Sequence, residues 1–239
     1  MLCLTTVCLQ HFDGGGPRVT WTKGFAFLAL VSMIALSGGV LAHARATTAA
    51  ARQQPRIFAV GHSWVVGLSS GQQIGYVDRL MHTAGVARVD ADHEGFTSRQ
   101  VRRLVDAAPR CGARDLAIVQ VGLNDVRLRG TDGLARFRRS LDAILQRLAR
   151  CPVILVQEPG ALDYTVPGQP LRGDHSVVGA YRRTTALVAN SRDNVTLVRP
   201  RLTENDYLAD GLHPDRSGNR AIYRAVTLSE TWKTFLRDR

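Results

Sequence analysis

Residues 116–125 read Leu-Ala-Ile-Val-Gln-Val-Gly-Leu-Asn-Asp, a nearly continuous apolar run that ends at glycine and polar residues. A short apolar run of this kind is typical of a strand that is covered on both faces, as strands are in a parallel sheet. Glycine, asparagine and aspartate are common where a regular element gives way to a turn. The stretch therefore predicts a buried parallel strand that ends in a polar turn.

The same pattern continues on both sides of this run, because strand-like and helix-like segments alternate along the chain. Four further strands are predicted at residues 56–60, 86–91, 153–157 and 195–198. Apolar residues at helical spacing predict helices at 74–84, 97–108, 134–148 and 174–190, and one closing helix at 215–236. Such alternation is typical of a three-layer α/β sandwich with a five-stranded parallel sheet between two layers of helices.

Ligands of open parallel sheets bind beyond the carboxyl ends of the strands, so the residues that follow each strand are the first candidates for a site. Small or polar groups follow four of the five predicted strands. We expect these groups to meet at one edge of the sheet. They are Gly61-His62-Ser63, Glu94-Gly95, Gly122-Leu-Asn124-Asp125 and Asp210-Gly-Leu-His213-Pro214.

The four groups together supply what acyl transfer requires: a nucleophile, a base, a partner for the base and donors for an oxyanion. Ser63 is the candidate nucleophile on a strand-to-helix turn. Asp210 and His213 are three residues apart, so the carboxylate can hold Nδ1 of the imidazole and leave Nε2 to face the serine. The backbone N–H of Gly95, the side-chain amide of Asn124 and the amide of Ser63 are the candidate oxyanion hole.

The order of these residues resembles the SGNH hydrolases, also called the GDSL esterase/lipase family, from Arg56 to about Ala225. The third and fourth groups are similar to its G-x-N-D and D-x-x-H-P blocks. The resemblance implies a flavodoxin-like sandwich and a serine esterase that needs no cofactor or metal. Its substrate would be a lipid ester, an acetylated sugar or a small ester. A catalytically silent module that binds glycan or lipid, and an acyltransferase with the same triad, are the alternatives.

The first block departs from the family, because Gly61-His62-Ser63-Trp64 stands where G-D-S-L is usual. Adjacent residues that leave a strand point in opposite directions, so His62 is expected to be structural rather than a second base. Trp64 is expected to pack in the core, and substrate binding beside Ser63 is the alternative. The second block is reduced to Glu94-Gly95-Phe96, so the role of Gly95 rests on fewer matching residues.

Residues 25–42 form an apolar run that is preceded by Arg18 and Lys23 and followed by Ala-x-Ala sequences. This three-part pattern is typical of an export signal, and an uncleaved N-terminal membrane anchor has the same pattern. The sequence thus predicts a leader at 1–44, a linker at 45–54 and a hydrolase domain at 55–239, with a secreted or cell-surface location.

Two cysteines, Cys111 and Cys151, fall in the predicted domain, each just before a strand. If those strands are neighbours, the two thiols lie at the same sheet edge and can form a disulfide in an oxidising compartment. Two buried free thiols are the alternative. Neither cysteine has the spacing of a metal ligand.

The formal net charge is +11, and nearly all of the basic residues are arginines. They fall on separate predicted helices among acidic residues, which predicts solvated helix faces rather than a nucleic-acid surface. Attraction to an anionic membrane or cell-wall surface is the alternative, and a monomer is expected. The Pro- and Gly-rich stretch at 158–173 predicts a substrate-contacting loop, with Leu162, Tyr164 and Val166 as its wall, or a passive surface excursion.

Overall fold

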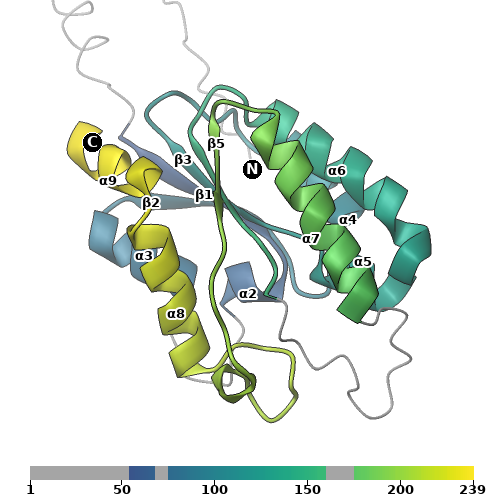
Figure 1. The fold of residues 1–239 in the computed structure, drawn as a ribbon. Helices are drawn as coiled ribbons and strands as arrows, with labels where there is room; N and C mark the ends of the chain where they lie inside the picture. The colour runs from purple at the N-terminus through teal and green to yellow at the C-terminus, as the bar shows by residue number, and fades with distance from the viewer. Residues whose placement is uncertain (1–53, 68–74, 160–174) are drawn as a thin grey trace, which may run out of the picture. The chain divides into compact units, whose positions relative to one another are not determined.

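The computed structural model of the chain describes residues 54–67, 75–159 and 175–239 (Figure 1). The predicted leader and most of the predicted linker lie outside these residues. So do Leu162, Tyr164 and Val166 of the predicted substrate loop. Among the residues described, no helix is both long and apolar enough to cross a membrane.

A five-stranded, fully parallel sheet forms the centre of the domain, as the sequence predicts. Its strand order is β2-β1-β3-β4-β5. The strands are β1 (Arg56–Gly61), β2 (Ala87–Asp92), β3 (Leu116–Gln120), β4 (Val153–Val156) and β5 (Val195–Val198). Every residue of β3 and β4 is buried, because helices cover both faces of these strands. Gly61, the last residue of β1, pairs with Asp92 on β2 and with Gln120 on β3, so the carboxyl ends of these three strands are level.

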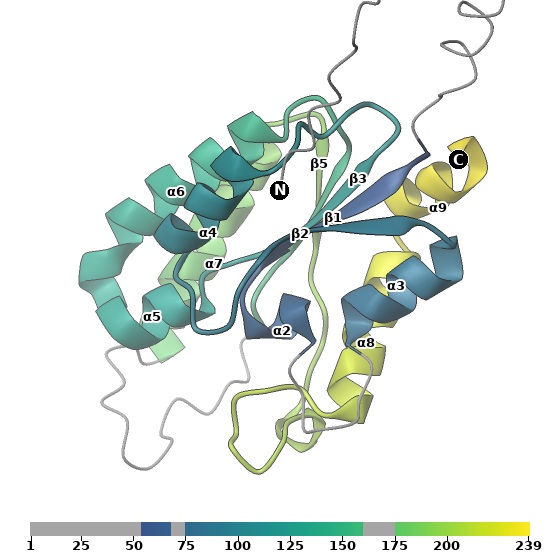
Figure 2. The ribbon, with the colours of Figure 1, turned by 180° about the vertical axis from the view of Figure 1, so that it is seen from behind.

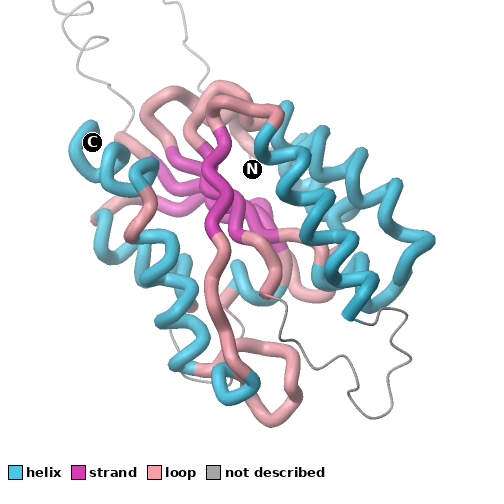
Figure 3. Tube along the Cα trace, in the orientation of Figure 1, coloured by secondary structure: helices cyan, strands magenta, loops and turns pink. Residues whose placement is uncertain are grey.

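Helices cover the two faces of the sheet in separate layers (Figures 1 and 2). One layer holds α3 (Tyr76–Ala84), α8 (Arg216–Thr227) and α9 (Glu230–Asp238); the other holds α4 (Ser98–Ala107), α6 (Leu134–Arg147) and α7 (His175–Asn190). Two short helices, α2 (Ser63–Val66) and α5 (Leu123–Arg129), begin at the carboxyl ends of β1 and β3. Figure 3 shows the same separation of strands, helices and loops. The layers confirm the predicted three-layer sandwich.

The predicted single closing helix is wrong, since two helices, α8 and α9, occupy this part of the chain. The helix breaks at Ser229, whose backbone is extended at φ −70° and ψ 143°. Its side chain caps α9 by accepting a hydrogen bond of 3.3 Å from the backbone N–H of Trp232. The break lets Trp232 and Phe235 turn into the core, where both are buried.

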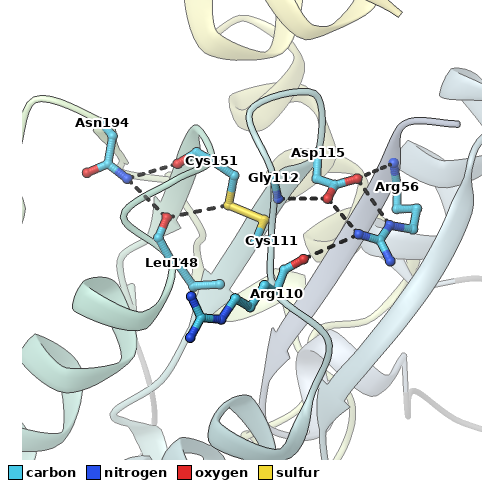
Figure 4. The surroundings of a disulfide bond; sticks show 8 residues. All are labelled: Arg56, Arg110, Cys111, Gly112, Asp115, Leu148, Cys151 and Asn194. Carbon is cyan, nitrogen blue, oxygen red and sulfur yellow. Dashed lines mark hydrogen bonds and ion pairs between the residues drawn. A yellow bond between two sulfur atoms is a disulfide. The ribbon is translucent and has the colours of Figure 1, made fainter. Parts of the chain in front are cut away.

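The predicted disulfide between Cys111 and Cys151 is present and joins the segments that lead into β3 and β4 (Figure 4). Asn194 supports the same corner, because its side-chain amide donates to the backbone carbonyl of Cys151 at 2.8 Å. On the neighbouring side, the Asp115 carboxylate accepts hydrogen bonds from the backbone N–H groups of Arg56 and Gly112. The cross-link thus lies at the amino edge of the sheet.

Candidate active site

Ser63 lies at the turn between β1 and α2, as its place after an apolar run predicts. The turn is tight because Gly61 has no side chain: a Cβ atom there would lie 2.3 Å from the backbone oxygen of Gln120. His62 caps α2, and Ser63 is the first residue of that helix. The sequence therefore fixes the serine at the N-terminus of a short helix above the carboxyl end of the central strand.

His213 and Asp210 meet Ser63 at this edge, although 150 residues separate the serine from the histidine. Nε2 of His213 lies 3.0 Å from Oγ of Ser63, and Nδ1 lies 2.6 Å from Oδ2 of Asp210. With a proton on Nδ1, the imidazole donates to the carboxylate and its Nε2 lone pair faces the serine hydroxyl. A hydroxyl, an imidazole and a carboxylate thus form one continuous hydrogen-bonded chain.

The carboxylate of Asp210 is held by three donors from its own loop. Besides the ring of His213, its Oδ1 atom accepts the backbone N–H groups of Leu212 and His213, each at 2.9 Å. Partial burial acts to raise the pKa of Asp210, but the hydrogen bonds from His213 and Leu212 outweigh it and the pKa lies below its ordinary value. Asp210 therefore stays charged across the neutral range.

The loop that carries Asp210 and His213 is itself fixed to the domain. The carbonyl of His213 accepts the backbone N–H of Leu208 at 2.8 Å. Asn219 donates from its side chain to the carbonyls of Pro214 and Asp215, and accepts the backbone N–H of Tyr76 at the start of α3. The buried Asn219 side chain thus ties the loop to the neighbouring helix, a role that no sequence motif indicates.

The three N–H groups predicted to bind an oxyanion belong to Ser63, Gly95 and Asn124, which follow the carboxyl ends of β1, β2 and β3. No hydrogen bond within the described residues occupies the backbone N–H of Ser63 or of Gly95. Asn124 uses one of its two amide hydrogens to bond the carbonyl of Phe96 at 3.0 Å, which leaves the second hydrogen available. This bond holds the loop after β2 against the start of α5. It therefore links Gly95, which follows β2, to Asn124, which follows β3.

The backbone around Asn124 differs from the predicted loop. Asn124 and Asp125 are buried within helix α5, which begins after Gly122. Gly122 has φ 125°, a conformation that suits glycine and turns the chain sharply from β3 into the helix. Asp125 accepts hydrogen bonds of 2.7 Å from both the backbone N–H and the hydroxyl of Ser98, while its burial raises its pKa. Asp125 thus joins the start of α4 to α5.

His62, the unusual residue of the first block, points away from the serine into the interior, as expected. Its ring is fully buried, and Nε2 lies 2.7 Å from Oε1 of Glu158 at the end of β4. The second carboxylate oxygen of Glu158 accepts from the side chain of Gln120, whose own oxygen accepts the hydroxyl of Tyr76. A buried polar network therefore lies beneath the nucleophile. Trp64 packs beside it and is 1% exposed, as the sequence predicts.

Arginines of α4 and α6 lie on separate helices and are exposed to solvent, as the sequence predicts, but some of them also come together in space, which the sequence does not indicate. Arg99 and Arg103 on α4 line the same cavity as Arg129 at the end of α5 and Arg136 on α6. Sequence distance hides this grouping, because α4 and α6 pack side by side on one face of the sheet (Figure 1). The cavity has a volume of about 370 Å³ and also reaches Gly95.

Comparisons with known proteins agree with this architecture. The sequence profile of the GDSL-like Lipase/Acylhydrolase family matches residues 59–221. A search of curated protein sequences finds no significant match.

Solved structures with the same fold include a lipase/acylhydrolase from Enterococcus faecalis, with 18% identity and a TM-score of 0.57 over 72% of this chain and 93% of that one. A variant of an acetyl xylan esterase from Geobacillus stearothermophilus has 16% identity and a TM-score of 0.55, covering 73% and 93%. A family 3 carbohydrate esterase from Clostridium thermocellum has 18% identity and a TM-score of 0.54, covering 77% and 98%. The profile match spans most of the chain, and with the ordered blocks around Ser63, Asn124 and His213 it shows that this protein belongs to the GDSL-like lipase/acylhydrolase family, the SGNH hydrolases.

Proposed function

We propose that the protein is an exported serine esterase that cleaves carboxylic esters through an acyl-enzyme on Ser63. The observation that carries the proposal is the chain of contacts from Ser63 Oγ through His213 to Asp210, at 3.0 and 2.6 Å. Both distances are within hydrogen-bond reach, which is the geometric requirement for a nucleophile activated by an oriented base. Membership of an acylhydrolase family supports the same reaction class.

In the first half of the reaction, Ser63 Oγ attacks the ester carbonyl carbon while its proton passes to Nε2 of His213. The carbonyl oxygen becomes an oxyanion, for which the amides of Ser63, Gly95 and Asn124 are the proposed donors. Asp210 orients the imidazole and stabilises its positive charge. The bond to the alcohol oxygen then breaks, and the alcohol leaves with the proton from Nε2.

In the second half, water repeats the attack on the acyl-enzyme. His213 takes a proton from the water as it adds to the acyl carbon, and a second oxyanion forms at the same donors. When the bond between the acyl carbon and Ser63 Oγ breaks, the proton on Nε2 returns to the serine. The carboxylic acid is released, and the enzyme regains its starting state with no metal or cofactor.

The proposed export rests on two features. The apolar run at 25–42 with its flanking basic and small residues is typical of a signal for translocation. The disulfide between Cys111 and Cys151 fits the same destination, because such bonds form and persist in oxidising compartments. We propose a secreted or cell-surface location.

The test combines a substrate with a covalent probe. The purified protein should hydrolyse short-chain 4-nitrophenyl esters and become labelled at Ser63 by a fluorophosphonate, and Ser63→Ala should abolish both. Addition of a sugar acceptor should not divert the acyl group from water. Absence of turnover and of labelling in a folded protein would refute the proposal, and acyl transfer to the acceptor in preference to water would replace it with an acyltransferase.

A further inference from the structure

The cavity beside the candidate oxyanion hole has an unusual charge. Four arginines line it: Arg99 and Arg103 lie one turn apart on α4, and Arg129 and Arg136 belong to α5 and α6. All four side chains are exposed, so their guanidinium groups are accessible from solvent. Three separate elements thus bring four positive charges around one hollow.

These four arginines differ from others in the domain because they lack acidic partners. Arg56, Arg88 and Arg192 each contact a carboxylate. Within the described part of the chain, none of the four cavity arginines forms an ion pair or a side-chain hydrogen bond. Like charges that face one hollow without partners repel one another, and an anion in that hollow relieves the repulsion.

One carboxylate, Asp125, is found among the described residues that line the cavity. It does not neutralise the arginines, because it is 2% exposed and both of its oxygens accept hydrogen bonds from Ser98. The balance at the cavity therefore favours a negatively charged ligand. Guanidinium groups bind carboxylate and phosphate oxygens in a forked geometry, which makes those two groups the best fit.

The position of the cavity connects it to the proposed reaction. Gly95, a candidate oxyanion donor, forms part of its wall, and Asp125 follows the second such donor, Asn124. The cavity thus shares Gly95 with the candidate oxyanion hole of the proposed reaction. The volume of about 370 Å³ suits a small group rather than a broad flat surface, since small-molecule sites begin at about 300 Å³.

We propose that this arginine pocket binds a carboxylate or phosphate group of the substrate, so that the enzyme prefers anionic esters over neutral esters of the same size. The proposal rests on the proposed esterase function and assigns a substrate class to it. The carboxylate can belong to the acyl part and the phosphate to the alcohol part, and the two sources are tested separately.

The experiment measures a ratio of kcat/KM for matched esters at low ionic strength, where charge effects are least screened. The acyl arm compares the mono-4-nitrophenyl ester of glutaric acid with 4-nitrophenyl pentanoate. The alcohol arm compares acetylated glycerol 3-phosphate with acetylated glycerol. In at least one arm the wild-type protein should prefer the anionic ester, and added salt should reduce the preference.

A pair of double variants decides whether the pocket causes the preference. Arg103→Gln with Arg136→Gln removes two pocket arginines. Arg102→Gln with Arg138→Gln removes two exposed arginines from the same helices outside the pocket. The first variant should lower the anionic-to-neutral ratio about tenfold or more, mainly through KM, because charged hydrogen bonds to the bound substrate are lost. The second should keep the ratio of the wild type.

Three outcomes would overturn the pocket: no preference in either arm, an unchanged ratio in the first variant, or an equal fall in both variants. An equal fall, together with equal loss of binding to vesicles of anionic phospholipid, would instead indicate diffuse attraction to a surface. If neutral and anionic esters are both inert, the esterase function fails and the pocket is judged by calorimetric binding of glutarate. Glutarate binding that is weaker in the first variant than in the second would support the arginine pocket. Equal glutarate binding by the two variants would refute it.

Discussion

Replacing both cysteines of the disulfide, Cys111→Ser with Cys151→Ser, should destabilise the domain without changing its chemistry. The bond closes a loop with a sequence separation of 40 residues. In the chain-entropy model, closing a loop of this length lowers the entropy of the unfolded chain by about 13 cal/mol/K. This raises the free energy of unfolding by about 4 kcal/mol at 25 °C. The loop contains α5, α6 and Asn124, so the cross-link limits the freedom of a functional part of the unfolded chain.

Thermal unfolding followed by circular dichroism measures this effect. A domain of this size loses about 2 to 4 °C in Tm for each kcal/mol, so the double variant should unfold about 8 to 16 °C below the oxidised wild type. Wild-type protein treated with a reductant is the matched control and should move in the same direction. The cross-link lies at the amino edge of the sheet and the proposed triad at the carboxyl edge, so kcat at 25 °C should not change.

Two results would refute this reasoning. If the double variant and the oxidised wild type unfold at the same temperature, the bond does not restrict the unfolded chain as calculated. If kcat falls severalfold while the variant is still fully folded, the amino edge influences the carboxyl edge in a way that the contacts do not explain.

Three further predictions concern the site. Asn124→Ala should lower kcat by about 10² to 10³ in a steady-state esterase assay, because one oxyanion donor is removed; an unchanged kcat would exclude Asn124 from the mechanism. His62→Asp should lower the free energy of unfolding by about 3 to 5 kcal/mol in urea, since it places a second carboxyl group against the buried Glu158, and adding Glu158→Gln should restore most of the loss; equal stability of the single variant and the wild type would contradict the buried pair. Burial raises the pKa of Asp92 to about 6 despite the nearby guanidinium of Arg88, so the folded state holds this proton more tightly than the unfolded state. Stability from this group is present below about pH 4 and is lost as the pH rises through about 6. Because solvent partly screens the group, we expect a fall on the order of 1 kcal/mol, which Asp92→Asn should abolish in urea titrations at several pH values; an identical pH profile in the variant would refute it.

The sheet and the spatial order of the site could be predicted because their signals are local. Apolar runs such as Leu116–Gln120 identify buried strands, and the polar residues after each run identify the carboxyl edge. Ser63, Asp210 and His213 then follow from chemistry, since few combinations of side chains supply a nucleophile, a base and its partner. The structure places these three residues in contact, and their catalytic roles remain a prediction.

What could not be predicted depends on contacts between distant segments. The start of helix α5 looks like a turn in sequence, because glycine, asparagine and aspartate favour turns. In the fold, Asp125 instead accepts hydrogen bonds from Ser98, a residue far away in the sequence, and the segment is helical. The break at Ser229 follows from burial of Trp232, which a repeating helical pattern does not reveal. The arginine pocket forms because α4 packs against α6. The distribution of charges along the sequence does not reveal this contact between two helices.

The altered first block shows how a departure from a family motif can be balanced elsewhere in the fold. With His62 before the nucleophile, the turn carries an imidazole instead of the usual carboxyl group, and a buried imidazole needs a partner for its ring nitrogens. Glu158 supplies a carboxylate from the end of β4, at 2.7 Å, and Gln120 on the intervening strand β3 contacts the same carboxylate. Three strands therefore share one polar network beneath Ser63. Because that network joins the ends of β1, β3 and β4, the altered residue next to Ser63 is anchored to the ends of two other strands, which compensates for the change in the motif.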